Sequence, residues 1–172
     1  HFGDPDLQAA SLQAVSKFRH VFSKVLTSQP AKIKPLTLVV DDTKWCVNKN
    51  VAAPRQQSTV RTQEMRRQTN EYLDANIIET SNASHISQVH MQKKQDTTEL
   101  RFTCDYRHLN DCTDGDKWPI PNIKSLFQQL GQKKPKYMAI LDLTKGYYQA
   151  PLDKNSRKYT AFITPDGTYQ WT

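Results

Sequence analysis

A chain of 172 residues with a formal net charge of +7 fits one ordinary domain or a part of a larger protein. Only 37% of its residues are hydrophobic, and no stretch approaches the ~18 consecutive apolar residues of a membrane span, which argues against a membrane protein. Three scattered cysteines, Cys46, Cys104 and Cys112, argue against a disulfide framework and favour an intracellular protein that is not secreted. Because the chain starts at His1 and its first methionine is Met65, we expect a part of a longer polypeptide.

The sequence before residue 58 predicts one helix and an extended connector. Residues 6–26 place apolar side chains near one helical face, and Ser28-Gln29-Pro30 ends this helix. Residues 31–57 contain Pro35 and Pro54, many polar side chains and no clear period. They predict a connector with one short strand at residues 36–40.

A second helix is expected over residues 58–75. Ser58 is a good N-cap, and Asn76 follows at the position where a left-handed residue commonly ends a helix. The side chains of its packing face recur at helical spacing: Met65, Thr69, Tyr72 and Leu73.

Alternating polarity predicts a β-hairpin between residues 89 and 106, with its turn at residues 95–98. The apolar residues of the return strand share one face: Leu100, Phe102, Cys104 and Tyr106. Lys93, Lys94 and Arg101 are therefore expected to project from an exposed hairpin with an apolar underside.

Asp142 is the first candidate for chemistry. A helix with apolar residues at Ile123, Leu126, Phe127 and Leu130, stopped by Gly131, precedes an apolar strand at residues 137–141. This strand would deliver Asp142 to the rim of a sheet, where a carboxylate can hold a divalent metal and the N–H groups of the following turn can bind phosphate oxygens. A plain turn cap is the alternative.

The end of the chain predicts more β-structure. Short strands are expected around residues 150–152, 159–164 and 168–172, with a hairpin turn at Pro165-Asp166-Gly167. Clusters of Lys and Arg along the whole chain suit a polyanionic partner such as nucleic acid, although such clusters are also common on inert surfaces.

The order of several motifs is that of a known family. They are Asp105-Tyr106-Arg107-x-Leu109-Asn110, Pro119-Ile120-Pro121, Leu141-Asp142-Leu143-x-x-Gly146-Tyr147-x-Gln149, Thr160-Ala161-Phe162 and Pro165-Asp166-Gly167-x-Tyr169-x-Trp171. Over residues 58–172 the chain resembles the front half of a reverse transcriptase from a gypsy-type LTR retrotransposon. Residues 1–57 resemble the linker between protease and polymerase in such a polyprotein.

This resemblance implies an α+β fold, namely an incomplete right-hand polymerase with fingers and the first part of a split βαβ palm. The implied divisions are an N-terminal helix and linker (1–57), fingers with the basic hairpin (58–115), the start of the palm (116–149) and a truncated return to the fingers (150–172). The implied location is a cytoplasmic particle or the nucleus.

The family adds deoxynucleotides to a primer 3′-OH by phosphoryl transfer with two Mg²⁺ ions. By resemblance, Asp142 is the first catalytic carboxylate, and the Leu143 carbonyl also binds metal. The backbone N–H groups of Lys145 and Gly146 would contact the triphosphate, and Tyr147 would select deoxynucleotides at the sugar.

The resemblance also assigns residues of the hairpin. Arg101 and either Lys93 or Lys94 would bind phosphates of the incoming nucleotide, while Asp105 and Arg107 would contact the template. The implied partners are an RNA or DNA template with its primer, a dNTP and the remainder of the polyprotein.

Each assignment has a plainer reading: a solvated strand residue for Arg101, a solubilising turn for Lys93 and Lys94, and a core position for Tyr147 or Tyr148. Their common order favours the functional reading.

The sequence also departs from the family. Ser84, His85 and Gln88 replace prolines and a tryptophan that are usual before the hairpin. The second and third catalytic carboxylates belong to a Tyr-x-Asp-Asp hairpin expected beyond Thr172, so we expect the 172 residues alone to be inactive. Asp41-Asp42 resembles such a pair but comes before Asp142, and a turn is the favoured reading.

Other features of the sequence bear on other classes of function. Cys104, His108 and Cys112 recur every four residues, as in a helical zinc site, but the alternating pattern favours a strand and turn, with no fourth ligand nearby. The alternatives to an enzyme are a nucleic-acid-binding remnant of a truncated retroelement and a domesticated domain used for protein contacts.

Overall fold

The computed structural model describes residues 4–22, 29–115, 119–143 and 145–172. Its α-helices are α1 (Pro5–Lys17), α2 (Asp42–Trp45), α3 (Thr59–Asp74), α4 (Arg107–Asp111), α5 (Ile123–Lys133) and α6 (Lys154–Arg157). Its 3₁₀ helices are η1 (Arg19–Val21), η2 (Asn48–Val51), η3 (Gly146–Gln149) and η4 (Lys158–Thr160). Its strands are β1 (Ile78–Thr80), β2 (Ser87–Lys93), β3 (Leu100–Cys104), β4 (Phe162–Thr164) and β5 (Gly167–Trp171). Within these residues no helix has the length and apolar character needed to cross a membrane.

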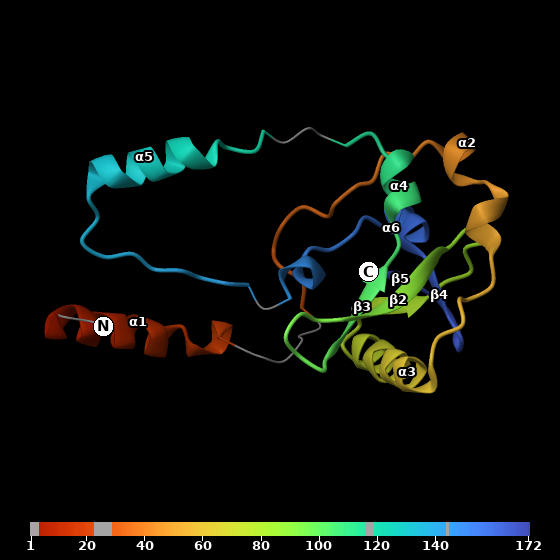
Figure 1. The fold of residues 1–172 in the computed structure, drawn as a ribbon, viewed down its shortest axis with the longest axis horizontal. Helices are drawn as coiled ribbons and strands as arrows, with labels where there is room; N and C mark the ends of the chain where they lie inside the picture. Colours follow the sequence, from red (N-terminus) through yellow and green to blue (C-terminus); the bar gives the residue numbers. More distant parts are fainter. Residues whose placement is uncertain (1–3, 23–28, 116–118, 144) are drawn as a thin grey trace.

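One five-stranded sheet organises the protein, in the order β1-β5-β4-β2-β3. Neighbouring strands are antiparallel except β2 and β4, which are parallel with Ser87 opposite Phe162. α3 packs along the sheet (Figure 1). The buried side chains of the main core come from both: Met65, Tyr72, Ile77, Ile78, Val89, Met91, Phe102, Phe162 and Tyr169. The predicted α+β class is therefore confirmed.

A smaller core fixes the connector that precedes α3. Trp45, Leu109, Cys112 and Tyr159 are buried together, and Leu38, Val40 and Tyr106 pack against them. The strand predicted at 36–40 is reduced to two isolated bridges, Leu36 with Leu152 and Val40 with Thr113. The strand predicted around 150–152 is likewise reduced to the first of these bridges. Side-chain packing therefore holds this part of the chain more than strand pairing does.

Three elements predicted from local patterns are confirmed. α3 follows Ser58, although the Ser58 side chain makes no capping hydrogen bond, and Asn76 has the expected left-handed backbone with φ 53°. β2 and β3 form the predicted hairpin, with Met91 opposite Phe102. The predicted turn joins β4 to β5, but β4 starts only at Phe162, because residues 158–160 form η4.

The two outlying helices differ from their predictions at the C-terminal end. α1 ends at Lys17, and the predicted end at residue 26 lies outside the described residues. α5 continues past Gly131 to Lys133, because Lys134, with φ 42°, is the residue that adopts the left-handed cap. Figure 1 shows α1 and α5 extending away from the sheet. No side chain of either helix is buried.

The strand predicted at residues 137–141 is wrong. These residues are extended but pair with no described strand, and Ile140 is 95% exposed. An apolar run becomes a strand only where a neighbouring strand supplies backbone hydrogen bonds and a surface for its side chains. Here the segment is a single connection between α5 and η3 (Figure 1). Asp142 therefore lies on an exposed segment and not at the rim of a sheet.

Phe162 should dominate the stability of the main core, because its side chain is fully buried between the sheet and α3. Phe162→Ala is expected to lower the free energy of unfolding by ~3–5 kcal/mol. Phe127→Ala removes the same atoms from α5, where the residue is 68% exposed, and should change the free energy of unfolding by no more than ~0.5 kcal/mol. Urea unfolding of both variants measures the difference, and equal losses would contradict this core.

Candidate functional site

A large hollow separates the hairpin from the Asp142 segment. Its volume is about 2420 Å³, and α3 and η3 also contribute to its walls. Predicted site residues from both sides line it: Lys94, Arg101, Asp142, Leu143, Lys145, Gly146 and Tyr147. The fold thus brings together the residues that the sequence assigned to one nucleotide, although they come from separate segments.

Asp142 offers a free carboxylate to this hollow. Its side chain is exposed, and no described residue forms a hydrogen bond or ion pair with it. Within the described ranges, no three His, Cys, Asp or Glu side chains are grouped as they would be around a metal ion. The carboxylate of Asp142 and the neighbouring Leu143 carbonyl are hard oxygen ligands, which Mg²⁺ prefers. They account for only part of the coordination that such an ion requires.

Tyr148 anchors the turn that follows Asp142. Its ring stacks on Trp171 at 5.1 Å and lies 5.2 Å from the ring of Tyr72. Its hydroxyl is 3.3 Å from the hydroxyl of Tyr72, and burial raises the pKa of Tyr148. Tyr147, in contrast, is 96% exposed. Of the two tyrosines, Tyr148 has the core role and Tyr147 is free to meet a ligand.

The turn itself is tight at Lys145 and Gly146. Lys145 is left-handed with φ 49°, and a Cβ on Gly146 would approach Leu143 Cβ to 3.1 Å. No described residue accepts a hydrogen bond from the backbone N–H of Lys145 or Gly146. These N–H groups are the type of donor that binds phosphate oxygens.

On the hairpin, successive residues face different hollows. Lys94 and Arg101 line the large hollow, and Lys94 forms an ion pair with Glu99 that lowers the pKa of the Glu99 carboxyl. Lys93 instead lines a second hollow of about 960 Å³ on the other side. Lys93 lines the second hollow together with its strand neighbours Met91 and Gln92. Of the two lysines left open by the sequence, Lys94 is the one that lines the same hollow as Asp142.

The second hollow contains the two predicted template residues. Arg107 donates to both carboxylate oxygens of Asp105, at 2.8 and 2.7 Å, and these hydrogen bonds lower the pKa of Asp105 to about 2. Arg55 and Arg61 also line this hollow, and Arg55 Nη1 is 2.8 Å from His90 Nε2. No sequence pattern points to Arg55, because it belongs to a connector without periodicity.

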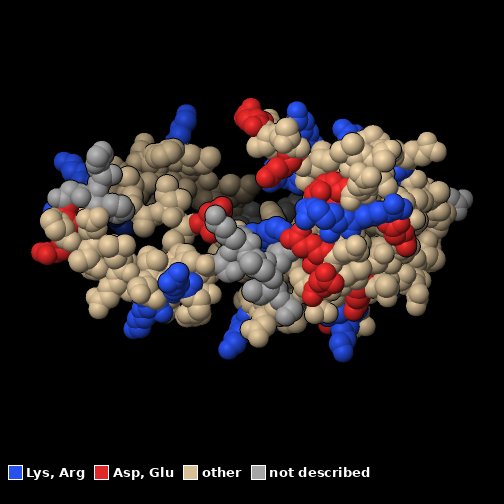
Figure 2. Space-filling model, turned by 90° about the horizontal axis from the view of Figure 1, so that it is seen from below, with Lys and Arg blue, Asp and Glu red and all other residues tan. Residues whose placement is uncertain are grey.

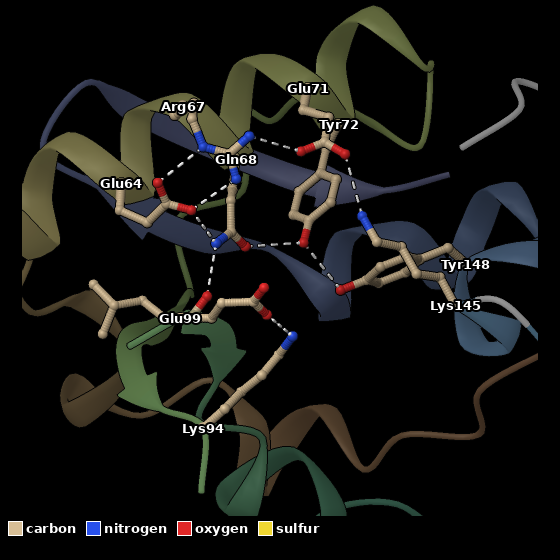
Figure 3. A network of polar contacts seen from close by, with 10 residues as sticks. Glu64, Arg67, Gln68, Glu71, Tyr72, Lys94, Glu99, Lys145 and Tyr148 are labelled. Atoms are coloured by element: carbon tan, nitrogen blue, oxygen red, sulfur yellow. Dashed lines mark hydrogen bonds and ion pairs between the residues drawn. The ribbon is translucent and has the colours of Figure 1, made fainter. Parts of the chain in front are cut away.

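A polar network on α3 forms one wall of the large hollow (Figure 3). Arg67 Nη2 lies 2.7 Å from Glu64 and its Nη1 lies 3.3 Å from Glu71, and the hydrogen bond from Arg67 lowers the pKa of Glu64 to about 2. Glu71 Oε1 also lies 3.2 Å from Lys145 Nζ. The i, i+3 and i, i+4 spacing of Glu64, Arg67 and Glu71 is visible in the sequence and could have predicted these ion pairs.

Two alternative sites have structural roles. Asp41 caps α2 by accepting from Thr43 N at 3.0 Å, and Asp42 accepts from the Tyr159 hydroxyl at 2.9 Å. The preference for a turn over a catalytic pair therefore agrees with the structure. The strand and turn expected after Cys104 is wrong in part, because residues 107–111 form α4, which places Cys112 Sγ 3.6 Å from His108 Nε2. That short contact is typical of side chains one helical turn apart.

Sequence comparisons place the chain among polymerases. A family model described as reverse transcriptase (RNA-dependent DNA polymerase) matches residues 91–172. The retrovirus-related Pol polyprotein from transposon 412 of Drosophila melanogaster is 30% identical over 177 residues, which cover 98% of this chain and 14% of that polyprotein. The corresponding polyprotein from transposon 297 is 36% identical over 112 residues, covering 63% of this chain and 10% of its own length.

Viral proteins are also similar. The enzymatic polyprotein of cauliflower mosaic virus (strain Strasbourg) is 30% identical over 121 residues, covering 69% of this chain and 18% of the polyprotein. The chain thus spans less than a fifth of the length of these relatives.

The fold is that of solved polymerase structures. The crystal structure of prototype foamy virus protease-reverse transcriptase matches 98% of this chain with a TM-score of 0.74 and 16% identity, over 22% of that chain. A foamy viral protease-reverse transcriptase in complex with double-stranded DNA matches 93% of this chain with a TM-score of 0.68, 15% identity and 27% coverage. The expected incomplete polymerase fold is therefore confirmed. The family match over residues 91–172 and the 30% identity to the transposon 412 polyprotein over 98% of this chain show that the chain belongs to the reverse transcriptase region of retrotransposon and retroviral Pol polyproteins.

Proposed function

We propose that the chain supplies the fingers and the start of the palm of a reverse transcriptase from a gypsy-type LTR retrotransposon. The observation that carries this proposal is the large hollow, where Lys94 and Arg101 of the hairpin lie opposite Asp142 and Lys145. The two Drosophila transposon polyproteins support the retrotransposon type. The complete enzyme would add deoxynucleotides to a primer 3′-OH on an RNA or DNA template.

The sheet supports the proposed division of the chain. β4 and β5 join β1, β2 and β3 in one sheet, as expected if residues 150–172 return to the fingers that residues 58–115 begin. Residues 116–149, which leave this sheet and carry Asp142, would be the start of the palm. Residues 1–57 would link the polymerase to the preceding part of the polyprotein.

The incoming dNTP would lie in the large hollow. Lys94 and Arg101 would bind its phosphates from the hairpin, since both carry positive charge into the hollow. The free N–H groups of Lys145 and Gly146 would bind the triphosphate from the opposite side. Tyr147, exposed at the same wall, would contact the sugar and exclude a 2′-OH by its bulk.

The Asp142 carboxylate and the Leu143 carbonyl would hold Mg²⁺, with the rest of the enzyme supplying the further carboxylates for two ions. Bound Mg²⁺ would neutralise charge on the phosphoryl oxygens of the reaction. Because the described residues provide one carboxylate at this position, polymerase activity is expected only when the remainder of the polyprotein is present.

The template would bind along the second hollow. Its lining contains Arg55, Arg61, Lys93 and Arg107 against the single carboxylate of Asp105, which leaves a positive surface for phosphates. Figure 2 shows, in contrast, that basic and acidic side chains are interspersed on the face of the sheet-containing part that it presents. The DNA-bound foamy viral relative supports a nucleic-acid partner.

Asp142→Asn tests the catalytic assignment. In a polypeptide extended to the full polymerase region, loss of the charged metal ligand should lower primer extension by roughly a thousandfold or more, since metal ligation contributes several kcal/mol to the barrier. Asp111→Asn, an exposed aspartate of α4, is the matched control and should leave extension unchanged. Undiminished extension by the Asp142 variant would rule out its catalytic role, whereas no extension by the unaltered extended polypeptide would favour a nucleic-acid-binding remnant.

Tyr147→Val tests the sugar contact. Removing the ring should raise incorporation of ribonucleotides relative to deoxynucleotides in the same extended polymerase, because the 2′-OH then meets no side chain. Tyr148→Phe, which removes only the hydroxyl that meets Tyr72, should keep the original preference. An unchanged ribonucleotide ratio in the Tyr147 variant would remove this assignment.

Salt dependence tests the template hollow. Binding of the chain to a primer–template should weaken steeply as salt rises, because each Lys or Arg contact to phosphate releases counterions. Arg55→Gln and Arg61→Gln should each lower the slope of log K against log salt by about 1. Arg66 pairs with Asp166 outside both hollows, so Arg66→Gln should leave the slope unchanged. A slope that does not respond to either change in the hollow would contradict this site.

A further inference from the structure

Both lysines of the proposed triphosphate site are already paired with carboxylates. Lys145 Nζ lies 3.2 Å from Glu71 Oε1, and Lys94 Nζ forms its ion pair with Glu99. Figure 3 shows the two pairs at opposite ends of one polar network. All four residues line the large hollow. A phosphate that binds either lysine therefore competes with a carboxylate for the charge of that lysine.

Glu71 contacts a second cation besides Lys145, so it can separate from Lys145 and still be paired. Its second oxygen, Oε2, lies 3.3 Å from Arg67 Nη1, so Glu71 keeps a cation when Lys145 leaves. Arg67 is in turn held by Glu64 at 2.7 Å and stays in place on α3. The side chains of Lys145 and Glu71 are each 38% exposed, and ion pairs at such positions are weak and readily exchanged.

The lining of the large hollow is close to electrically balanced, although the chain as a whole carries +7. Its charged lining consists of the carboxylates Glu64, Glu71, Glu99 and Asp142 and the cations Arg67, Lys94, Arg101, Lys145 and Arg157. The second hollow has four cations to one carboxylate. A nucleic-acid backbone is thus attracted to the second hollow, whereas the large hollow becomes strongly positive only when its carboxylates are displaced or neutralised.

We infer that Glu71 and Glu99 are positioning and specificity-determining residues for the phosphate ligand, which hold Lys145 and Lys94 in the free protein and exchange them for phosphate on binding. The inference rests on the proposed nucleotide site. Each exchange separates an ion pair, so a highly charged triphosphate compensates for it better than a monophosphate does. The two carboxylates therefore favour triphosphates over singly phosphorylated ligands and over stray backbone phosphates.

Binding of inorganic tripolyphosphate to the 172-residue chain, measured by calorimetry in metal-free buffer, tests this exchange. Glu71→Gln and Glu99→Gln should each tighten binding about two- to fivefold, the equivalent of one exposed ion pair. Asp166→Asn is the matched control, because it changes the net charge equally but frees Arg66 outside the hollow. With inorganic phosphate as the probe, the same variants should show a larger relative gain than with tripolyphosphate.

Double variants show whether the effect passes through the lysines. The gain in tripolyphosphate affinity from Glu71→Gln should vanish when it is combined with Lys145→Met. The gain from Glu99→Gln should likewise vanish when it is combined with Lys94→Met. Thermal unfolding shows whether Glu71→Gln disturbs the α3 network. Glu99 lies on the hairpin, so binding by the Glu99→Gln variant tests the exchange even if that network is disturbed. Unchanged or weaker binding in both Gln variants, or an equal gain in Asp166→Asn, would overturn the exchange alone. Absence of tripolyphosphate binding in every protein would overturn the proposed nucleotide site as well.

Discussion

The aromatic contact of Tyr148 with Trp171 and Tyr72 determines the geometry of the candidate site. It joins η3 to β5 and α3, so the turn after Asp142 is held against the sheet although the segment before it is exposed. Aromatic pairs of this kind contribute about 0.5–1.5 kcal/mol beyond the area that they bury. With Tyr148 fixed inward, Tyr147 points to solvent and Lys145 reaches Glu71.

The two hollows divide the basic residues of the hairpin between two different electrostatic settings. Lys94 enters a hollow whose charges nearly cancel, and Lys93 enters one where positive charge prevails. A long polyanion is drawn to uncompensated charge over many contacts, whereas a compact ligand is recognised by a few well-placed groups. The basic residues of one hairpin thus line two hollows of different charge.

The elements that sequence patterns predicted correctly are those fixed by local rules. The helical spacing around Met65 and Tyr72 and the alternation from Leu100 to Cys104 need no distant partner to be recognised. The segment at residues 137–141 failed because a strand requires neighbours that its own residues do not encode. Asp142 and Arg101 were identified by motif order, but the ion pairs of Lys145 and Lys94 depend on contacts between distant segments, and Arg55 has no local signal.

The parallel pairing of β2 with β4 has a consequence for how this region folds. Phe162 completes a core whose other members lie mostly between residues 65 and 102, so this core stays incomplete during synthesis until β4 has left the ribosome. Long-range closure of this kind is slow relative to hairpin and helix formation. The connection between β3 and β4, which includes the Asp142 segment, thus has its second end fixed only when β4 pairs with β2. A longer connection would add little to the entropic cost of this closure, because that cost grows slowly with loop length.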